Sequence, residues 1–319
     1  MSQAPKPAAK LDAARTAAAE LPRLHSLLVS WRGDLVLEHY GKGIRPGRLA
    51  NVKSVSKSVI SALIGIAIER RLIKSVDTPI VTYFPQLSKD TDPKKREITI
   101  EDLLAMRSGL ESTSFDNYGM WVRSRNWIQF VLDRPMISEP GTTMEYSTGS
   151  THLLSAIITS VSKTNTHQFA QEVLAKPLGF TLARWPRDPQ GIYFGGNDML
   201  LTPRQMVTFG ELYLRRGRAG GRQIVPEAWV DTSCVPRGRS RFNPDQQYGY
   251  GWWTRGFADR ESCFAWGFGG QYIFVFRDLD LVVVTTSAAD VSDERRGHRS
   301  MIFDILERLI IPEIEATRP

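Results

Sequence analysis

The tetrapeptide Ser-Val-Ser-Lys occurs twice in this chain of 319 residues, at 54–57 and again at 160–163. A serine at position i and a lysine at i+3 lie on the same face of a helix, which lets the amine reach the hydroxyl. A lysine that packing has removed from water can lose its proton and activate such a serine as a nucleophile. Chance alone would supply about one match of this kind in a chain of this length, so the surroundings must separate the two copies.

The surroundings favour the first copy. Ser54 precedes the run VISALIGIAI (59–68), which carries no charge before Glu69 and therefore predicts a helix buried on all sides. Ser54 would lie at the positive end of that helix, where a developing oxyanion is favoured. Lys57 would be a buried ammonium, which needs a partner or a purpose. The simpler alternative is an N-cap serine followed by a solvated lysine.

The second copy closes the predicted helix LLSAIITSV (153–161). Ser160 would therefore lie at the negative end, where an alkoxide is disfavoured, and Lys163 would be an ordinary charge that complements the helix dipole. We expect no chemistry from this copy.

The composition is that of a soluble globular protein, with 42% hydrophobic and 24% charged residues. The net charge of +7 is scattered along the chain, which argues against nucleic acid as a partner. No apolar run is long enough for an integral membrane segment. The N-terminus lacks the apolar core of a secretion signal, so we expect a cytoplasmic protein, or an exported one if a leader has been trimmed.

The two cysteines, Cys234 and Cys263, have no metal-ligand spacing and are too few for a disulfide framework, so we expect free thiols. The five histidines show no zinc-binding pattern. We therefore expect no metal.

Alternating apolar residues predict two β-hairpins, one over 27–40 with a turn at 32–33 and one over 272–287 with a turn at 277–280. A final amphipathic helix is expected over 293–315, with Met301, Ile302, Ile305, Leu306, Leu309 and Ile310 on its apolar stripe. Strands near both termini indicate one antiparallel sheet.

The middle of the chain predicts helices over 100–106, 126–133, 147–161, 166–178 and 203–216. The fold class is thus α/β plus all-α. We expect an N-terminal tail or helix over 1–22, an α/β domain from 23–75 and 246–319, an inserted helical domain over 76–245, and an active-site cleft between the two domains.

With Ser54 and Lys57 as its Ser-x-x-Lys motif, the chain resembles the serine β-lactamase and penicillin-binding-protein superfamily. Within it, the chain looks most like the class C-type hydrolases that include family VIII esterases and 6-aminohexanoate-dimer hydrolase. The stretches ITIEDLLAMRSGL (98–110), PGTTMEYSTGS (140–150) and LTPRQMVTFGELYL (201–214) belong to the same resemblance. It implies a β-lactamase/transpeptidase-like fold and an acyl-enzyme mechanism that needs no cofactor.

The second motif of that superfamily, Tyr-x-Asn, matches Tyr146-Ser147-Thr148. A phenol beside a lysine could be held partly as phenolate and carry the serine proton to the leaving group. Thr148 departs from the asparagine of the pattern. This weakens the case for β-lactam recognition, since a hydroxyl cannot donate and accept hydrogen bonds as a carboxamide does.

The third motif, Lys-Thr-Gly, aligns with Ala265-Trp266-Gly267. This alignment makes the backbone N–H groups of Ser54 and Phe268 the oxyanion hole. Because the cation of the motif is missing, a neutral ester or amide is favoured over penicillin.

Further expectations concern an apolar acyl pocket and the edge of the cleft. The candidates for substrate contact are Tyr118, Trp121, Thr148, Asn197, Trp266 and Gly267, with Trp253 as a further aromatic residue of the pocket. The expected partner is a small-molecule ester or amide, and the protein is expected to be a monomer or a homodimer.

The expected function is that of a serine hydrolase, most simply an esterase. An amidase, a weak β-lactamase or a D-peptidase is the alternative of the same class. A Ser-His-Asp hydrolase is a mechanistic rival, although the chain has no Gly-x-Ser-x-Gly elbow. A non-catalytic binding or sensor module on the same fold is the alternative of another class.

Overall fold

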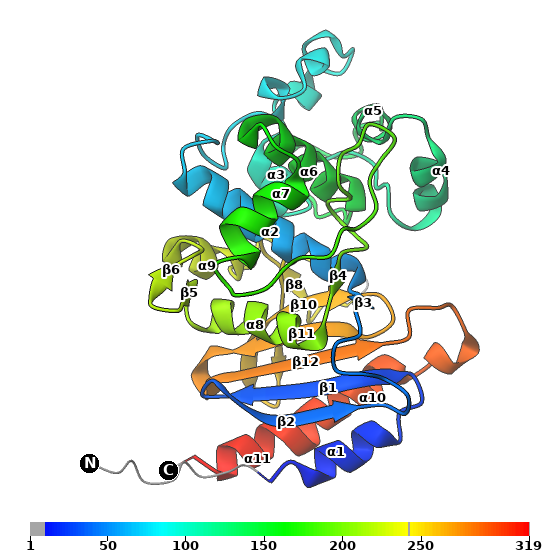
Figure 1. Cartoon of the computed structure of the whole chain (residues 1–319). Coiled ribbons are helices and arrows are strands. Elements are labelled where there is room, and N and C mark those ends of the chain that lie inside the picture. The colour runs from blue at the N-terminus through cyan, green and yellow to red at the C-terminus, as the bar shows by residue number, and fades with distance from the viewer. Residues whose placement is uncertain (1–9, 242, 319) are drawn as a thin grey trace.

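The computed structural model describes residues 10–241 and 243–318, and its centre is an eight-stranded antiparallel sheet with the strand order β2-β1-β12-β11-β10-β9-β8-β7 (Figure 1). The strands are β1 (Leu24–Trp31), β2 (Asp34–Tyr40), β7 (Gly238–Arg239), β8 (Gln247–Tyr248), β9 (Trp253–Phe257), β10 (Arg260–Gly267), β11 (Gln271–Phe276) and β12 (Leu281–Ser287). Both predicted hairpins are confirmed, as is the union of N- and C-terminal strands in one sheet.

The centre of this sheet is buried on both faces. All residues of β11 and β12 are buried, which explains why these strands are apolar without a break. Helices α1 (Asp12–Ala19), α10 (His298–Ile305) and α11 (Ile311–Ala316) cover one face, and α2 (Ser56–Glu69) and α8 (Pro203–Leu214) lie over the other (Figure 1). Gly210 lets α8 approach β11 and β12 closely, because a Cβ there would come within 2.5 Å of Val282 and 2.9 Å of Ile273.

Five further helices form a layer beyond α2: α3 (Ile100–Leu104), α4 (Tyr118–Arg123), α5 (Trp127–Leu132), α6 (Thr148–Ser162) and α7 (Thr166–Ala170) (Figure 1). Helix α9 (Glu227–Ser233) packs beside α2, next to the sheet. The loops contain two small two-stranded sheets. One pairs β3 (Ala50–Asn51) with β4 (Leu200–Leu201), and the other pairs β5 (Arg218–Ala219) with β6 (Arg222–Gln223). Twelve of the fourteen residues of α2 are buried, as its apolar sequence predicted. Within the described ranges, no helix has the length and apolar character that a membrane crossing requires.

The C-terminal helix differs from the expected continuous one. It is divided into α10, a π-helical turn over Leu306–Ile310 and α11. Pro312 lacks an N–H group and crowds the carbonyl of the preceding turn, so the regular α-helical ladder cannot run through this point. Met301 is 37% exposed and does not belong to the buried stripe, whereas Phe303 does.

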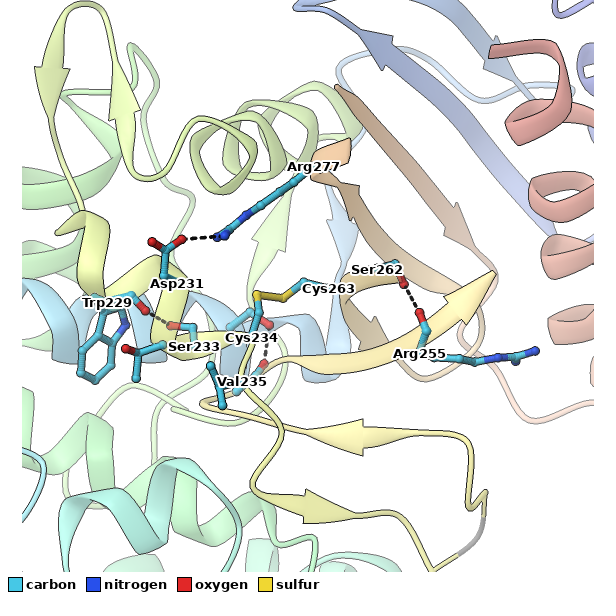
Figure 2. The surroundings of a disulfide bond; sticks show 12 residues. Trp229, Asp231, Ser233, Cys234, Val235, Arg255, Ser262, Cys263 and Arg277 are labelled. Carbon is cyan, nitrogen blue, oxygen red and sulfur yellow. Dashed lines mark hydrogen bonds and ion pairs between the residues drawn. A yellow bond between two sulfur atoms is a disulfide. The ribbon is translucent and has the colours of Figure 1, made fainter. Parts of the chain in front are cut away.

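The expectation of two free thiols is wrong, because Cys234 and Cys263 form a disulfide with a Cα–Cα distance of 5.7 Å (Figure 2). Cys234 caps the C-terminus of α9, and Cys263 lies in β10. Helix α9 is held there by an ion pair of 2.6 Å between Asp231 and Arg277. The cysteines are 29 residues apart, so only the folded chain reveals the pairing.

We expect the double substitution Cys234→Ser/Cys263→Ser to lower the free energy of unfolding by about 3–4 kcal/mol, because the disulfide closes a loop of 29 residues in the unfolded chain. Urea titration followed by tryptophan fluorescence measures this change. The oxidised protein and the same protein reduced with a thiol are the matched comparison. Equal stability of the oxidised protein and the double variant would contradict the prediction.

Candidate active site

Ser54 and Lys57 meet at the start of α2. Residues Lys53–Val55 form a 3₁₀ turn that leads into the helix at Ser56, so Ser54 is not the N-cap of α2. The side chain of Lys57 is buried, and its Nζ lies 3.1 Å from the partly exposed Ser54 Oγ. This geometry excludes the alternative of a capping serine followed by a solvated lysine.

The Lys57 amine is enclosed by oxygen atoms. Besides Ser54 Oγ, it contacts the carbonyl oxygen of Gly196 at 2.6 Å and Thr148 Oγ1 at 3.2 Å. A carbonyl can only accept a hydrogen bond, so one N–H must point at Gly196. If a second N–H points at Thr148, the lone pair of the neutral amine is left facing Ser54.

Burial favours that neutral form. Removal of the ammonium from water lowers the pKa of Lys57 to about 7, although the nearby carboxylate of Asp198 partly opposes this effect. Gly196 has no side chain to crowd the amine, because a Cβ there would lie 2.6 Å from Thr148 Cγ2 and 3.4 Å from Lys57 Nζ. Lys57 can therefore take up a proton near neutral pH.

Tyr146 lies on the loop before α6, and the centre of its ring is 5.0 Å from Lys57 Nζ. The ring stacks on Trp253 with 5.6 Å between the ring centres and meets the edge of Tyr248 at 5.9 Å. Burial raises the pKa of Tyr146 well above its ordinary value, and a hydrogen bond with Ser54 offsets only part of this rise. The expected phenolate is thus disfavoured: the phenol keeps its proton, whereas the amine can lose its own near neutral pH.

The segment 112–114 holds the N-terminus of α6 in place. Ser114 Oγ accepts a hydrogen bond from the Thr148 N–H, and Thr113 Oγ1 accepts one from the Gly149 N–H, both at 2.9 Å. Ser114 Oγ also lies 2.9 Å from Thr148 Oγ1, which fixes the hydroxyl that contacts Lys57. Neither Ser114 nor the Gly196 carbonyl could be identified from the sequence, since neither carries a motif of its own.

The end of β10 lies against the turn that carries Ser54. A Cβ on Gly267 would come within 2.2 Å of the Val52 carbonyl and 3.1 Å of Lys53 Cβ, so only glycine fits there. Phe268 follows directly, and its carbonyl accepts a hydrogen bond from the buried Gln271 amide at 3.3 Å. The Phe268 N–H as an oxyanion donor stays a prediction.

Some of the residues expected to line the substrate pocket are partly exposed, and others are buried. Tyr118 and Asn197 are partly exposed, and the Asn197 amide donates a hydrogen bond of 2.9 Å to the Tyr118 hydroxyl. Trp266 is partly exposed and stacks on Tyr272 on the face of the sheet that α10 covers. Trp121 is 0% exposed and packs in the core, so its expected contact with substrate is wrong.

Two buried histidines have polar partners, but neither forms an accessible Ser-His-Asp triad. His152 and Asp188 pair at 3.0 Å with both side chains 0% exposed, which secures the loop before Gly196 to α6. His298 contacts Ser287 at 2.9 Å beneath the turn after β10, and burial lowers the pKa of His298 to about 4. Across 10–241 and 243–318, no group of three or more His, Cys, Asp or Glu side chains is arranged to hold a metal ion.

The second Ser-Val-Ser-Lys copy lies elsewhere. Ser160 is exposed near the C-terminus of α6, and Lys163 caps that helix in a left-handed conformation with its side chain exposed. The structure thus brings only the first copy together with Tyr146 and Thr148.

Residues 25–306 match the Beta-lactamase family. The 6-aminohexanoate-dimer hydrolase of Paenarthrobacter ureafaciens is 21% identical over 92% of this chain and 81% of its own. The solved structure of EstCE1, a hydrolase with promiscuous acyltransferase activity, superposes with a TM-score of 0.75 at 17% identity, covering 93% of this chain and 97% of the other. A D-stereospecific amidohydrolase from Streptomyces sp. gives 0.67 at 17% identity, over 90% and 98%. On the match that spans nearly its whole length, the chain belongs to the Beta-lactamase family.

Proposed function

We propose that this protein is a serine hydrolase that cleaves a small ester or amide through an acyl-enzyme, with esters as the better substrates. The observation that carries the proposal is the buried Lys57 amine 3.1 Å from the accessible Ser54 hydroxyl. A base that is neutral near pH 7 and in contact with a hydroxyl is the pairing that nucleophilic catalysis by serine requires.

In the first half of the reaction, Ser54 Oγ forms a bond to the substrate carbonyl carbon and gives its proton to Lys57 Nζ. The carbonyl π electrons move to oxygen, where the N–H groups of Ser54 and Phe268 stabilise the negative charge. When the tetrahedral intermediate collapses, the bond to the leaving group breaks. The leaving group takes a proton from the Tyr146 phenol, which Lys57 then reprotonates. Water repeats the sequence and releases the acid.

The preference for neutral substrates follows from the third motif. Ala265 is 1% exposed and Trp266 lies on the other face of the strand, so neither position offers a cation to a substrate carboxylate. The similar proteins are named as a hydrolase with promiscuous acyltransferase activity, a 6-aminohexanoate-dimer hydrolase and a D-stereospecific amidohydrolase. These names leave both bond types open.

Ser54→Ala should reduce the hydrolysis of p-nitrophenyl acetate or butyrate to the rate of the buffer, because it removes the nucleophile. Ser160→Ala is the matched control from the second tetrapeptide and should retain at least half of the activity. Initial rates at 405 nm measure both. Equal activity of the two variants would remove Ser54 from the mechanism.

The rate at which a fluorophosphonate labels Ser54 should fall about tenfold per pH unit below pH 7, because protonated Lys57 cannot accept the serine proton. Above pH 8 the rate should be constant until the phenol ionises. Lys57→Arg keeps the cation but has no accessible neutral form, so this variant should not be labelled at any pH. A wild-type profile that is flat from pH 5 to 9 would contradict the role of Lys57.

Nitrocefin should be cleaved with a kcat/KM about 100-fold lower than that of a short neutral ester, since Ala265 stands where the third motif carries its lysine. A lysine introduced by Ala265→Lys would disturb a buried site. The comparison therefore uses the wild-type protein and measures kcat/KM for the carboxylate and methyl-ester forms of the same substrate. A consistent preference for the carboxylate forms would reverse the proposed substrate class.

A further inference from the structure

A short loop links two lysines that flank the nucleophile. The carbonyl of Gly196 contacts Lys57 Nζ, and two residues later Asp198 Oδ1 accepts hydrogen bonds from Lys53 Nζ at 3.0 Å and from Asn51 Nδ2 at 2.8 Å. One of these lysines is thus held by a carbonyl and the other by a carboxylate.

Lys53 occupies an unusual backbone conformation for a lysine. Its φ is +50°, in the left-handed region, and its N–H donates a hydrogen bond of 3.0 Å to Asn51 Oδ1. Glycine would adopt this conformation without steric cost. The backbone therefore does not require lysine at this position, which directs attention to the ammonium group and its partner Asp198.

The charge of Asp198 acts directly on the reactive amine. An anion near Lys57 favours the protonated form of the amine. Burial raises the pKa of the Tyr118 phenol, and the same carboxylate adds a smaller rise. Tyr146, from the loop before α6, also faces the Lys57 amine, and it is a neutral phenol. Burial sets most of the proton affinity of Lys57, and the net charge on the Lys53–Asp198 pair then modifies it.

We propose that Lys53 is a positioning residue whose ammonium neutralises Asp198 and thereby keeps the Lys57 amine available as a base. This inference rests on the proposed function, because it assigns Lys53 a part in the same proton transfer. The pair is partly exposed, with side-chain exposures of 25% for Lys53 and 20% for Asp198. Solvent therefore screens the field, and the expected shifts are moderate.

A double-mutant cycle tests the proposal through the pH midpoint of Ser54 labelling by a fluorophosphonate. Lys53→Met leaves the carboxylate unpaired and should raise the midpoint by about one pH unit, whereas Asp198→Asn leaves the ammonium unpaired and should lower it by a similar amount. The double variant should return to within about half a unit of the wild type. Lys53→Arg retains the charge and should behave as the wild type.

A purely structural role would give another pattern. Loss of rate at all pH values with an unchanged midpoint in Lys53→Met, or a double variant no better than the worse single one, would overturn the proposal. Urea titration of each variant identifies loss of folding. If Lys53→Met does not fold, the pH midpoint of Asp198→Asn, compared with that of Lys53→Arg, still tests the proposal.

A direct measurement separates this inference from the proposed function. In protein labelled with ¹³C-lysine, the Lys57 signal is identified by its absence in Lys57→Met, and its pH titration is followed in each variant. Failure of the midpoints to move in opposite directions overturns the role of Lys53. The midpoints could also move as expected in a protein that hydrolyses no ester or amide. That result would support the electrostatic role of Lys53 and contradict the proposed hydrolase function.

Discussion

Removal of one ammonium group from water is the constraint on which the site depends. The desolvation penalty for a buried lysine would be severe if the group stayed charged, and the protein meets it by giving the amine three oxygen neighbours and a proton affinity near neutrality. The same burial acts in the opposite sense on Tyr146, where the charged form is the anion. One apolar environment therefore yields a neutral amine and a neutral phenol, and both can exchange protons with the serine hydroxyl between them.

The groups around the amine come from segments far apart in the chain, and buried polar bonds hold these segments in place. Ser114 and Thr113 satisfy the first N–H groups of α6, and the His152–Asp188 pair secures the loop that presents Gly196. The bare backbone at Gly267 lets the end of β10 touch the turn that carries Ser54. Such contacts make the site rigid, which preorganised catalysis requires.

Features with a local signature could be predicted from the sequence. The hairpins, the buried helix after Ser54 and the contrast between the two tetrapeptides follow from periodicity and from the direction of the helix dipole. The Gly196 carbonyl and the Ser114 hydroxyl could not be found in this way, because a backbone oxygen has no residue type and serines are common. The predicted substrate contact of Trp121 was wrong for a related reason. The sequence does not distinguish an aromatic residue of the core from one that lines a pocket. Pairing of Cys234 with Cys263 depends on how α9 docks, which no spacing encodes.

The sheet joins the first strand to the last one. β1 pairs with β12, and the indole of Trp31 donates a hydrogen bond to the carbonyl of Leu279, 248 residues further along the chain. During synthesis on a ribosome, the N-terminal hairpin must therefore wait until almost the entire polypeptide has emerged before its inner edge is covered. Exposed strand edges invite pairing with other chains during that interval. Chaperone supply and the rate of translation, more than the stability of the finished molecule, are then expected to govern the yield of active protein from a heterologous host.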